Sequence, residues 1–258
     1  MIPIKDDIPT DRLPIVTYLL LAINVLVYLY SLRQGGSIFG GPSGTTSVRY
    51  GAIPYEFTHP GSHCELTTVG VVACEGQAGV IGTAGSQPAT GLTALTSMFM
   101  HGSLLHLGGN MLFLFIFGNN VEDSMGRGRF VVFYILGGLA ALGLQILVDT
   151  NGTAPTIGAS GAIAAVLGGY ILLYPRARVL TVVFIIFFFT LIELPALVVL
   201  GIWFAEQALL GTAGLADTVG GGSGVAYFAH VGGFVFGLAV IRAFAQRRKQ
   251  IEPRLPVY

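Results

Sequence analysis

The chain has 258 residues, of which 53% are hydrophobic and 10% are charged. Soluble domains carry roughly 25% charged residues, so this composition excludes an ordinary soluble fold. Lys and Arg together number 13, as do Asp and Glu, and this balance argues against nucleic acid as a partner. We therefore expect an integral membrane protein.

Several long stretches carry no charged residue and reach the roughly 20 apolar residues that cross a bilayer. We predict one all-α domain, a bundle of six membrane spans. The spans are expected at residues 13–32, 97–118, 130–149, 157–174, 191–211 and 225–245. Residues 1–12 precede the bundle, and residues 246–258 form a C-terminal tail. The first run is interpreted as a retained helix, since no cleavage site follows it.

Basic residues are distributed unevenly between the two sides of this arrangement. Eleven of the thirteen lie on the side of the N-terminus, and only Arg33 and Arg49 lie on the other. Because Lys and Arg set the orientation of membrane proteins, both termini are expected in the cytoplasm. The protein is expected in the plasma or inner membrane of a cell.

The start of the fifth span is placed from a proline rather than from hydropathy. The apolar stretch from Arg178 to Gly211 is too long for one crossing, and Pro195 disfavours helix at the residue before it while suiting a first helical turn. The span is therefore placed at 191–211. The preceding "VLTVVFIIFFF" is interpreted as an apolar connecting segment near the membrane face.

The first loop, residues 33–94, is expected to be external, irregular and rich in Gly, Ser and Thr. It contains the only two cysteines, Cys64 and Cys74, whose spacing suits a disulfide. Two free thiols remain the alternative. No Cys/His spacing typical of a metal site occurs, and no cofactor is expected.

Polar side chains in the second span require protein or water around them. His106 and Asn110 are four residues apart in "HGSLLHLGGN" and share a helix face. His101 lies nearly opposite His106 on a regular helix, or else just beyond the membrane end. These residues and Ser103 are expected to line a cavity, although hydrogen bonding between helices is the simpler alternative.

The fourth and sixth spans carry small residues beside one polar group each. Ser160 stands between Gly158 and Gly161, and His230 precedes Gly233 and Gly237, whose spacing permits close helix approach. Taken singly, both polar residues are better explained by packing. Together with span two, however, three helices of the same direction place Ser160, His230 and His106/Asn110 at similar depths. A nucleophile, a base and an oxyanion donor are what acyl transfer requires.

Four ordered motifs resemble the rhomboid family of intramembrane serine proteases across residues 92–245. They are "HGSLLHLGGN", "VEDSMGRGRFVVFYILGGLAA", "GASG" and "AHVGGFVFG". The resemblance implies hydrolysis of a peptide bond in or near a substrate's transmembrane segment. Ser160 would be the nucleophile and His230 the base. Asn110, His106 and the Ser160 N–H would stabilise the oxyanion.

Two positions depart from the family pattern. "RYGAIPYE" stands where part of the family has a Trp-Arg pair, and Ala164 stands where some members place a tyrosine against the histidine. What orients His230 is therefore open, and no carboxylate is indicated for that role. Gly158 and Gly161 are expected to permit the turn beside Ser160.

The leading hypothesis is thus a protease whose partners are transmembrane protein substrates and the lipid bilayer. Lateral entry of the substrate helix past the fifth span is expected. The competing hypotheses are an inactive rhomboid-like protein that binds or escorts membrane helices, and a solute transporter. A transporter is disfavoured because no internal repeat is found.

Overall fold

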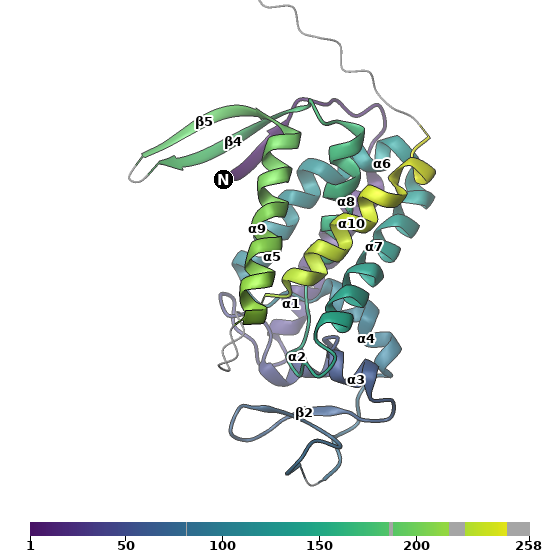
Figure 1. Ribbon diagram of the computed structural model, residues 1–258, viewed down its shortest axis with the longest axis vertical. Coiled ribbons are helices and arrows are strands. Elements are labelled where there is room, and N and C mark those ends of the chain that lie inside the picture. The colour runs from purple at the N-terminus through teal and green to yellow at the C-terminus, as the bar shows by residue number, and fades with distance from the viewer. Residues whose placement is uncertain (81, 186–187, 217–224, 247–258) are drawn as a thin grey trace, which may run out of the picture.

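The structure, a computed structural model, describes residues 1–80, 82–185, 188–216 and 225–246. Most of these residues form helices that stand side by side in one bundle (Figure 1). Within the described ranges, five helical segments are long and apolar enough to cross a membrane, and they are Ile15–Leu32, Leu104–Met125, Arg127–Val148, Ala196–Ala213 and Tyr227–Phe244. The predicted all-α membrane class is confirmed. The predicted tail lies outside the described residues from 247 onward.

The second span begins later than predicted and continues further. It consists of α5 (Leu104–Phe113), a π-helical segment (Leu114–Gly118) and α6 (Asn119–Met125). The Ser103 side chain accepts a hydrogen bond from the His106 N–H at 3.0 Å and caps the helix. Gly126, with φ of 82°, ends it. This shift puts His106 and Asn110 in the first two turns of α5.

The other long helices are α1 (Ile15–Leu32), α7 (Arg127–Val148), α9 (Ala196–Ala216) and α10 (Tyr227–Phe244). The fourth predicted span is the shorter helix α8 (Ser160–Leu173), which has 14 residues. It lies in the middle of the bundle, packed against α7 and α10, and residues 161–169 are all buried. A central helix need not span the bilayer alone, because neighbouring helices enclose the irregular backbone that precedes it.

The first loop is more ordered than predicted. It contains α2 (Gly44–Tyr50), α3 (Pro54–Thr58), the paired strands β2 (Cys64–Leu66) and β3 (Val72–Cys74), and α4 (Thr90–Thr96), which is followed by a 3-10 turn (Ser97–Phe99). Cys64 and Cys74 face each other across the strand pair and form a disulfide. The loop elements gather at one end of the bundle, which we call the loop end (Figure 1).

A β-sheet at the opposite end was not expected from the sequence. β1 (Ile2–Asp6) pairs with β4 (Arg178–Ile185), which pairs with β5 (Phe188–Pro195), all antiparallel. The apolar connecting segment is thus a β-hairpin, in keeping with the high strand propensity of Val, Ile and Phe. The fifth span consequently starts at Ala196 rather than 191, directly after Pro195.

Both described ends of the chain meet α6 at this second end of the bundle. Asp6 accepts a hydrogen bond from Asn120, and the Gln246 N–H donates to the Ser124 carbonyl. The Glu122 carboxylate accepts from the backbone N–H groups of Val16 and Thr17, and so caps the first turn of α1. Glu122 therefore fastens the start of α1 to α6.

Candidate active site

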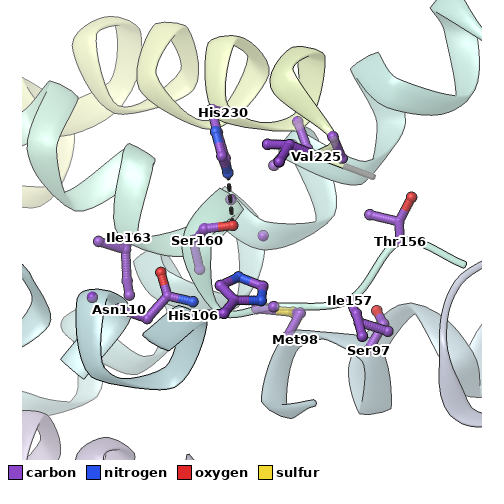
Figure 2. Close-up of a pocket in the computed structure, with 18 of the residues that line it drawn as sticks. Ser97, Met98, His106, Asn110, Thr156, Ile157, Ser160, Ile163, Val225 and His230 are labelled. Carbon is purple, nitrogen blue, oxygen red and sulfur yellow. Dashed lines mark hydrogen bonds between the residues drawn. The ribbon is translucent and has the colours of Figure 1, made fainter. Parts of the chain in front are cut away.

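Ser160 and His230 meet inside the bundle although 70 residues separate them. Ser160 is the first residue of α8, and His230 lies in the first turn of α10. The Ser160 Oγ is 2.8 Å from the His230 Nε2, a hydrogen-bond distance (Figure 2). A serine hydroxyl and an imidazole in this contact are the pair that nucleophilic catalysis requires.

The segment before α8 holds Ser160 at the head of the helix. Thr156 exchanges two backbone hydrogen bonds with Ala52 of the first loop, at 2.8 and 3.1 Å, and the Gly158 N–H donates to the Ser97 carbonyl. Gly158 has φ of 132°, and a Cβ there would lie 2.8 Å from the His106 ring. Glycine fits this turn at position 158, whereas Gly161, also expected to permit the turn, lies within α8. The "RYGAIPYE" stretch contributes Ala52 to this support.

Close contact between α8 and α10 brings the two residues together. A Cβ on Gly233 would lie 2.0 Å from the Gly161 carbonyl oxygen, and one on Gly237 would lie 2.0 Å from the Ala165 carbonyl oxygen. The two backbones thus touch directly along this seam, which is what a Gly-xxx-Gly spacing permits. His230 projects from the loop-end turn of the same helix.

Two donors approach Ser160 from α5. Asn110 is 8% exposed, and its Nδ2 makes no hydrogen bond within the described part of the chain. Figure 2 shows this nitrogen on the side of Ser160 and His106. The His106 Nδ1 accepts from the Gly102 N–H at 3.3 Å, which leaves the proton on Nε2, the atom next to Gly158. Both side chains are therefore able to donate toward the serine.

His101 occupies a different place from the other sequence candidates. It precedes α5, is 1% exposed, and packs its ring edge against His106 with 5.1 Å between ring centroids. Burial, together with the neighbouring His106, lowers the pKa of His101 to about 3, so this ring is neutral. It supports His106 and does not line the cavity described next.

A cavity of about 530 Å³ opens beside the dyad. Its polar lining comes from Ser97, Ser103, His106, Asn110, Thr156, Ser160, Gln207 and His230. Its apolar lining includes Phe113, Leu142, Ile163 and Trp203, which come from α5, α7, α8 and α9. Apolar walls with a few convergent polar groups are typical of a ligand-binding pocket.

The motifs in the sequence do not indicate what binds the other end of the His230 ring. In the structure, the Gln207 Oε1 lies 2.7 Å from the His230 Nδ1. Gln207 is on α9 and is 8% exposed. One signal for it exists in the sequence: a lone amide in the apolar run "VVLGIWFAEQALLG" needs a partner inside the bundle.

The family of the chain follows from a comparison of its sequence with models of known protein families. A model of the Rhomboid domain matches residues 89–247, which is more than half of the chain. This chain is a member of the rhomboid family. The match includes α5, α8, α9 and α10, and therefore every residue of the site described above.

Curated rhomboid relatives resemble the chain over shorter ranges. Rhomboid protein 1, mitochondrial, of Saccharomyces cerevisiae is 36% identical over 97 residues, which cover 36% of this chain and 28% of the yeast protein. Presenilin-associated rhomboid-like protein, mitochondrial, is 31% identical in Mus musculus and 30% in Homo sapiens over 149 residues, or 56% of this chain. These residues are 36% and 35% of the two mammalian proteins. The chain thus matches about a third of the length of these relatives.

The relatives correct the expected location. The sequence suggested a plasma membrane with both termini in the cytoplasm, but the yeast, mouse and human rhomboid proteins above are all named as mitochondrial. A plasma membrane location is therefore not supported. The charge bias that prompted it distinguishes the two sides of a membrane without identifying the membrane.

Proposed function

We propose that this rhomboid is an intramembrane serine endopeptidase that hydrolyses peptide bonds in or near transmembrane segments of other proteins. The observation that carries the proposal is the 2.8 Å contact between the Ser160 Oγ and the His230 Nε2 beside a partly polar cavity within the helix bundle. Family membership supports the same reaction class.

In the proposed first step, the Ser160 Oγ attacks the carbonyl carbon of the scissile bond while its proton passes to the His230 Nε2. The resulting tetrahedral intermediate collapses when the C–N bond breaks and His230 returns the proton to the leaving amine. Water then attacks the acyl-serine ester with His230 again as base, releasing the acid and restoring Ser160. General base catalysis contributes roughly 100- to 10,000-fold to such steps.

The oxyanion of the intermediate would form at the N-terminus of α8. As the first residue of that helix, Ser160 has a backbone N–H with no acceptor in the preceding turn, and the helix dipole favours negative charge there. Asn110 and His106 are the side-chain donors we assign to the same oxygen. Donors aimed at a developing oxyanion are often the largest single contribution to catalysis.

Substrate would reach the cavity from the lipid, past α9. Trp203 and Gln207 of α9 line the cavity on one face, whereas Leu197, Ile202 and Leu209 of the same helix are exposed on the surface of the bundle. α9 therefore stands between the cavity and the surroundings. We assign it as the wall that moves when a transmembrane segment enters.

Cleavage of a single-span reporter protein by the purified protein in liposomes tests the proposal. Ser160→Ala and His230→Ala should each abolish cleavage, and Ser160→Ala should also abolish labelling by a fluorophosphonate probe. Undiminished cleavage by either variant would rule out this mechanism. A folded wild-type protein that binds the reporter but neither cleaves it nor reacts with the probe would favour the escort function.

A further inference from the structure

The helix that bears Gln207 lies at the edge of the bundle. α9 packs mainly against α10 and touches the central helix α8 at few points (Figure 1). Leu197, Ile202 and Leu209 leave much of its outer face exposed. Only a small inner face of α9 therefore holds it against the rest of the bundle.

That inner face reaches the catalytic histidine through two side chains one turn apart. Trp203 packs against the His230 ring with 5.8 Å between ring centroids. Gln207, four residues later, lies 2.7 Å from the His230 Nδ1 with its side-chain oxygen. Residues at this spacing share a helix face. One face of α9 therefore contacts both a side and an end of the ring.

The hydrogen bond to Gln207 determines where the imidazole carries its proton. An amide oxygen has no proton to give, so the His230 Nδ1 must be the donor in this contact. In a neutral ring the Nε2 then has a free lone pair. That lone pair faces the Ser160 hydroxyl, which is the state that a general base requires.

The other contacts of the His230 ring do not determine which of its nitrogens carries the proton. Ala164 of α8, which stands where some family members place a tyrosine against the histidine, is fully buried and has no polar group to offer the ring. Tyr227 meets the His230 ring edge to face at 6.5 Å between centroids. Packing contacts of these kinds restrict the ring without distinguishing its two nitrogens. Gln207 is the polar contact of Nδ1 that the structure describes.

We propose that Gln207 is the positioning residue of the dyad and that His230 is a competent base only while α9 lies against α10. The inference rests on the proposed protease function. It adds that α9 does more than border the entry path, because moving it away would remove the acceptor that selects the working tautomer of His230.

The first test compares Gln207→Leu with Gln145→Leu. Gln145 is a matched control because it is an amide on the membrane helix α7 whose side-chain oxygen is buried, and it does not line the cavity. Since a positioned base contributes roughly 100- to 10,000-fold, loss of its orientation alone should lower kcat about 10- to 100-fold with little change in KM. Gln145→Leu should keep wild-type kcat.

Labelling of Ser160 by the fluorophosphonate probe separates positioning from substrate entry. The probe is small and does not require a transmembrane segment to pass α9. Its reaction still needs His230 to take the serine proton as fluoride leaves. The labelling rate of Gln207→Leu should therefore fall by a factor similar to the fall in kcat. A normal labelling rate with slow reporter cleavage would overturn the inference and leave α9 with an entry role only.

Gln207→Glu supplies a readout that simple packing would not change. A carboxylate can accept the same hydrogen bond, so this variant should retain more activity than Gln207→Leu. Its negative charge also favours the protonated ring, so the acidic limb of the pH–rate profile should move to higher pH. An unmoved profile, or equal activity in Gln207→Leu and Gln145→Leu, would refute the positioning role while wild-type cleavage still supported the protease function.

Discussion

At the scale of single residues, the motifs located four residues of the proposed active site but not Gln207, the residue that contacts His230 from α9. Ser160, His230, Asn110 and His106 each stand in a short pattern with fixed spacing, and the structure brings all four to one cavity. Gln207 has no such pattern, because it contacts His230 across 23 residues and from another helix. Tertiary contacts of this kind are not encoded in local spacing.

Asn110 provides the most direct test of oxyanion stabilisation. Its Nδ2 is buried without a hydrogen bond among the described residues, and it would gain one only when an oxyanion forms. We expect Asn110→Ala to lower kcat roughly 100-fold with KM nearly unchanged, as removal of one oxyanion donor does. Single-turnover cleavage of the reporter measures this.

The control for that measurement is Asn119→Ala. Asn119 begins α6 within the same membrane span, and it lies outside the cavity lining. The Asn119→Ala variant should cleave the reporter at the wild-type rate. If Asn110→Ala matched it in kcat, Asn110 would have no part in transition-state stabilisation.

At the scale of elements, long charge-free helices were predictable from the sequence and the pairing of neighbouring strands was not. Charge-free runs located α1, α7 and α10 to within a few residues. The hairpin β4–β5 was missed because a continuous apolar run of Val, Ile and Phe fits a buried helix as well as a strand. α5 was misplaced because its start depends on the Ser103 cap rather than on hydropathy.

Because α8 and α10 touch along the glycine seam, a Gly→Ala substitution at the seam and one away from it should change stability in opposite directions. A Cβ at position 237 would lie 2.0 Å from the Ala165 carbonyl oxygen, so the helices must separate. Overpacking of this kind costs about 1–3 kcal/mol. Gly237→Ala should therefore lower the thermal unfolding midpoint in detergent, and cleavage should fall because His230 moves away from Ser160.

Gly143→Ala is the matched substitution on α7. A Cβ at position 143 meets no atom within 4 Å, so the methyl group adds no clash. Replacing a helical glycine by alanine stabilises by about 0.5–1 kcal/mol. The unfolding midpoint should hold or rise. If Gly143→Ala lowered the unfolding midpoint as much as Gly237→Ala, the loss at position 237 could not be attributed to the close contact between α8 and α10.

At the scale of the whole molecule, the charge bias predicted that the two termini share a side, and the structure places both described ends beside α6. What the bias could not reveal is that residues 2–6 form a strand paired with the β4–β5 hairpin, since that contact joins positions more than 170 residues apart. Long-range strand pairing leaves no local signature in either segment.

The anchor of this N-terminal strand should respond to pH. The Asp6 Oδ2 accepts hydrogen bonds from Asn120 and from the Tyr170 hydroxyl, both at 2.6 Å. Burial, opposed by the Tyr170 hydrogen bond and assisted by the charge of Asp7, raises the pKa of Asp6 from 3.8 to about 6. The docked strand therefore holds a proton that the released strand loses above its ordinary pKa.

Docking should accordingly be tightest below about pH 4 and weaken as the pH rises to about 6, by roughly tenfold per pH unit within that window. Hydrogen exchange at the β1 amides, corrected for the intrinsic pH dependence of exchange, measures the release. Asp6→Asn keeps the shape of the side chain but cannot ionise, so its corrected protection should be flat across the window. An equally steep pH dependence in Asp6→Asn would assign the effect to another group, because the strand would then loosen without any change in charge at position 6.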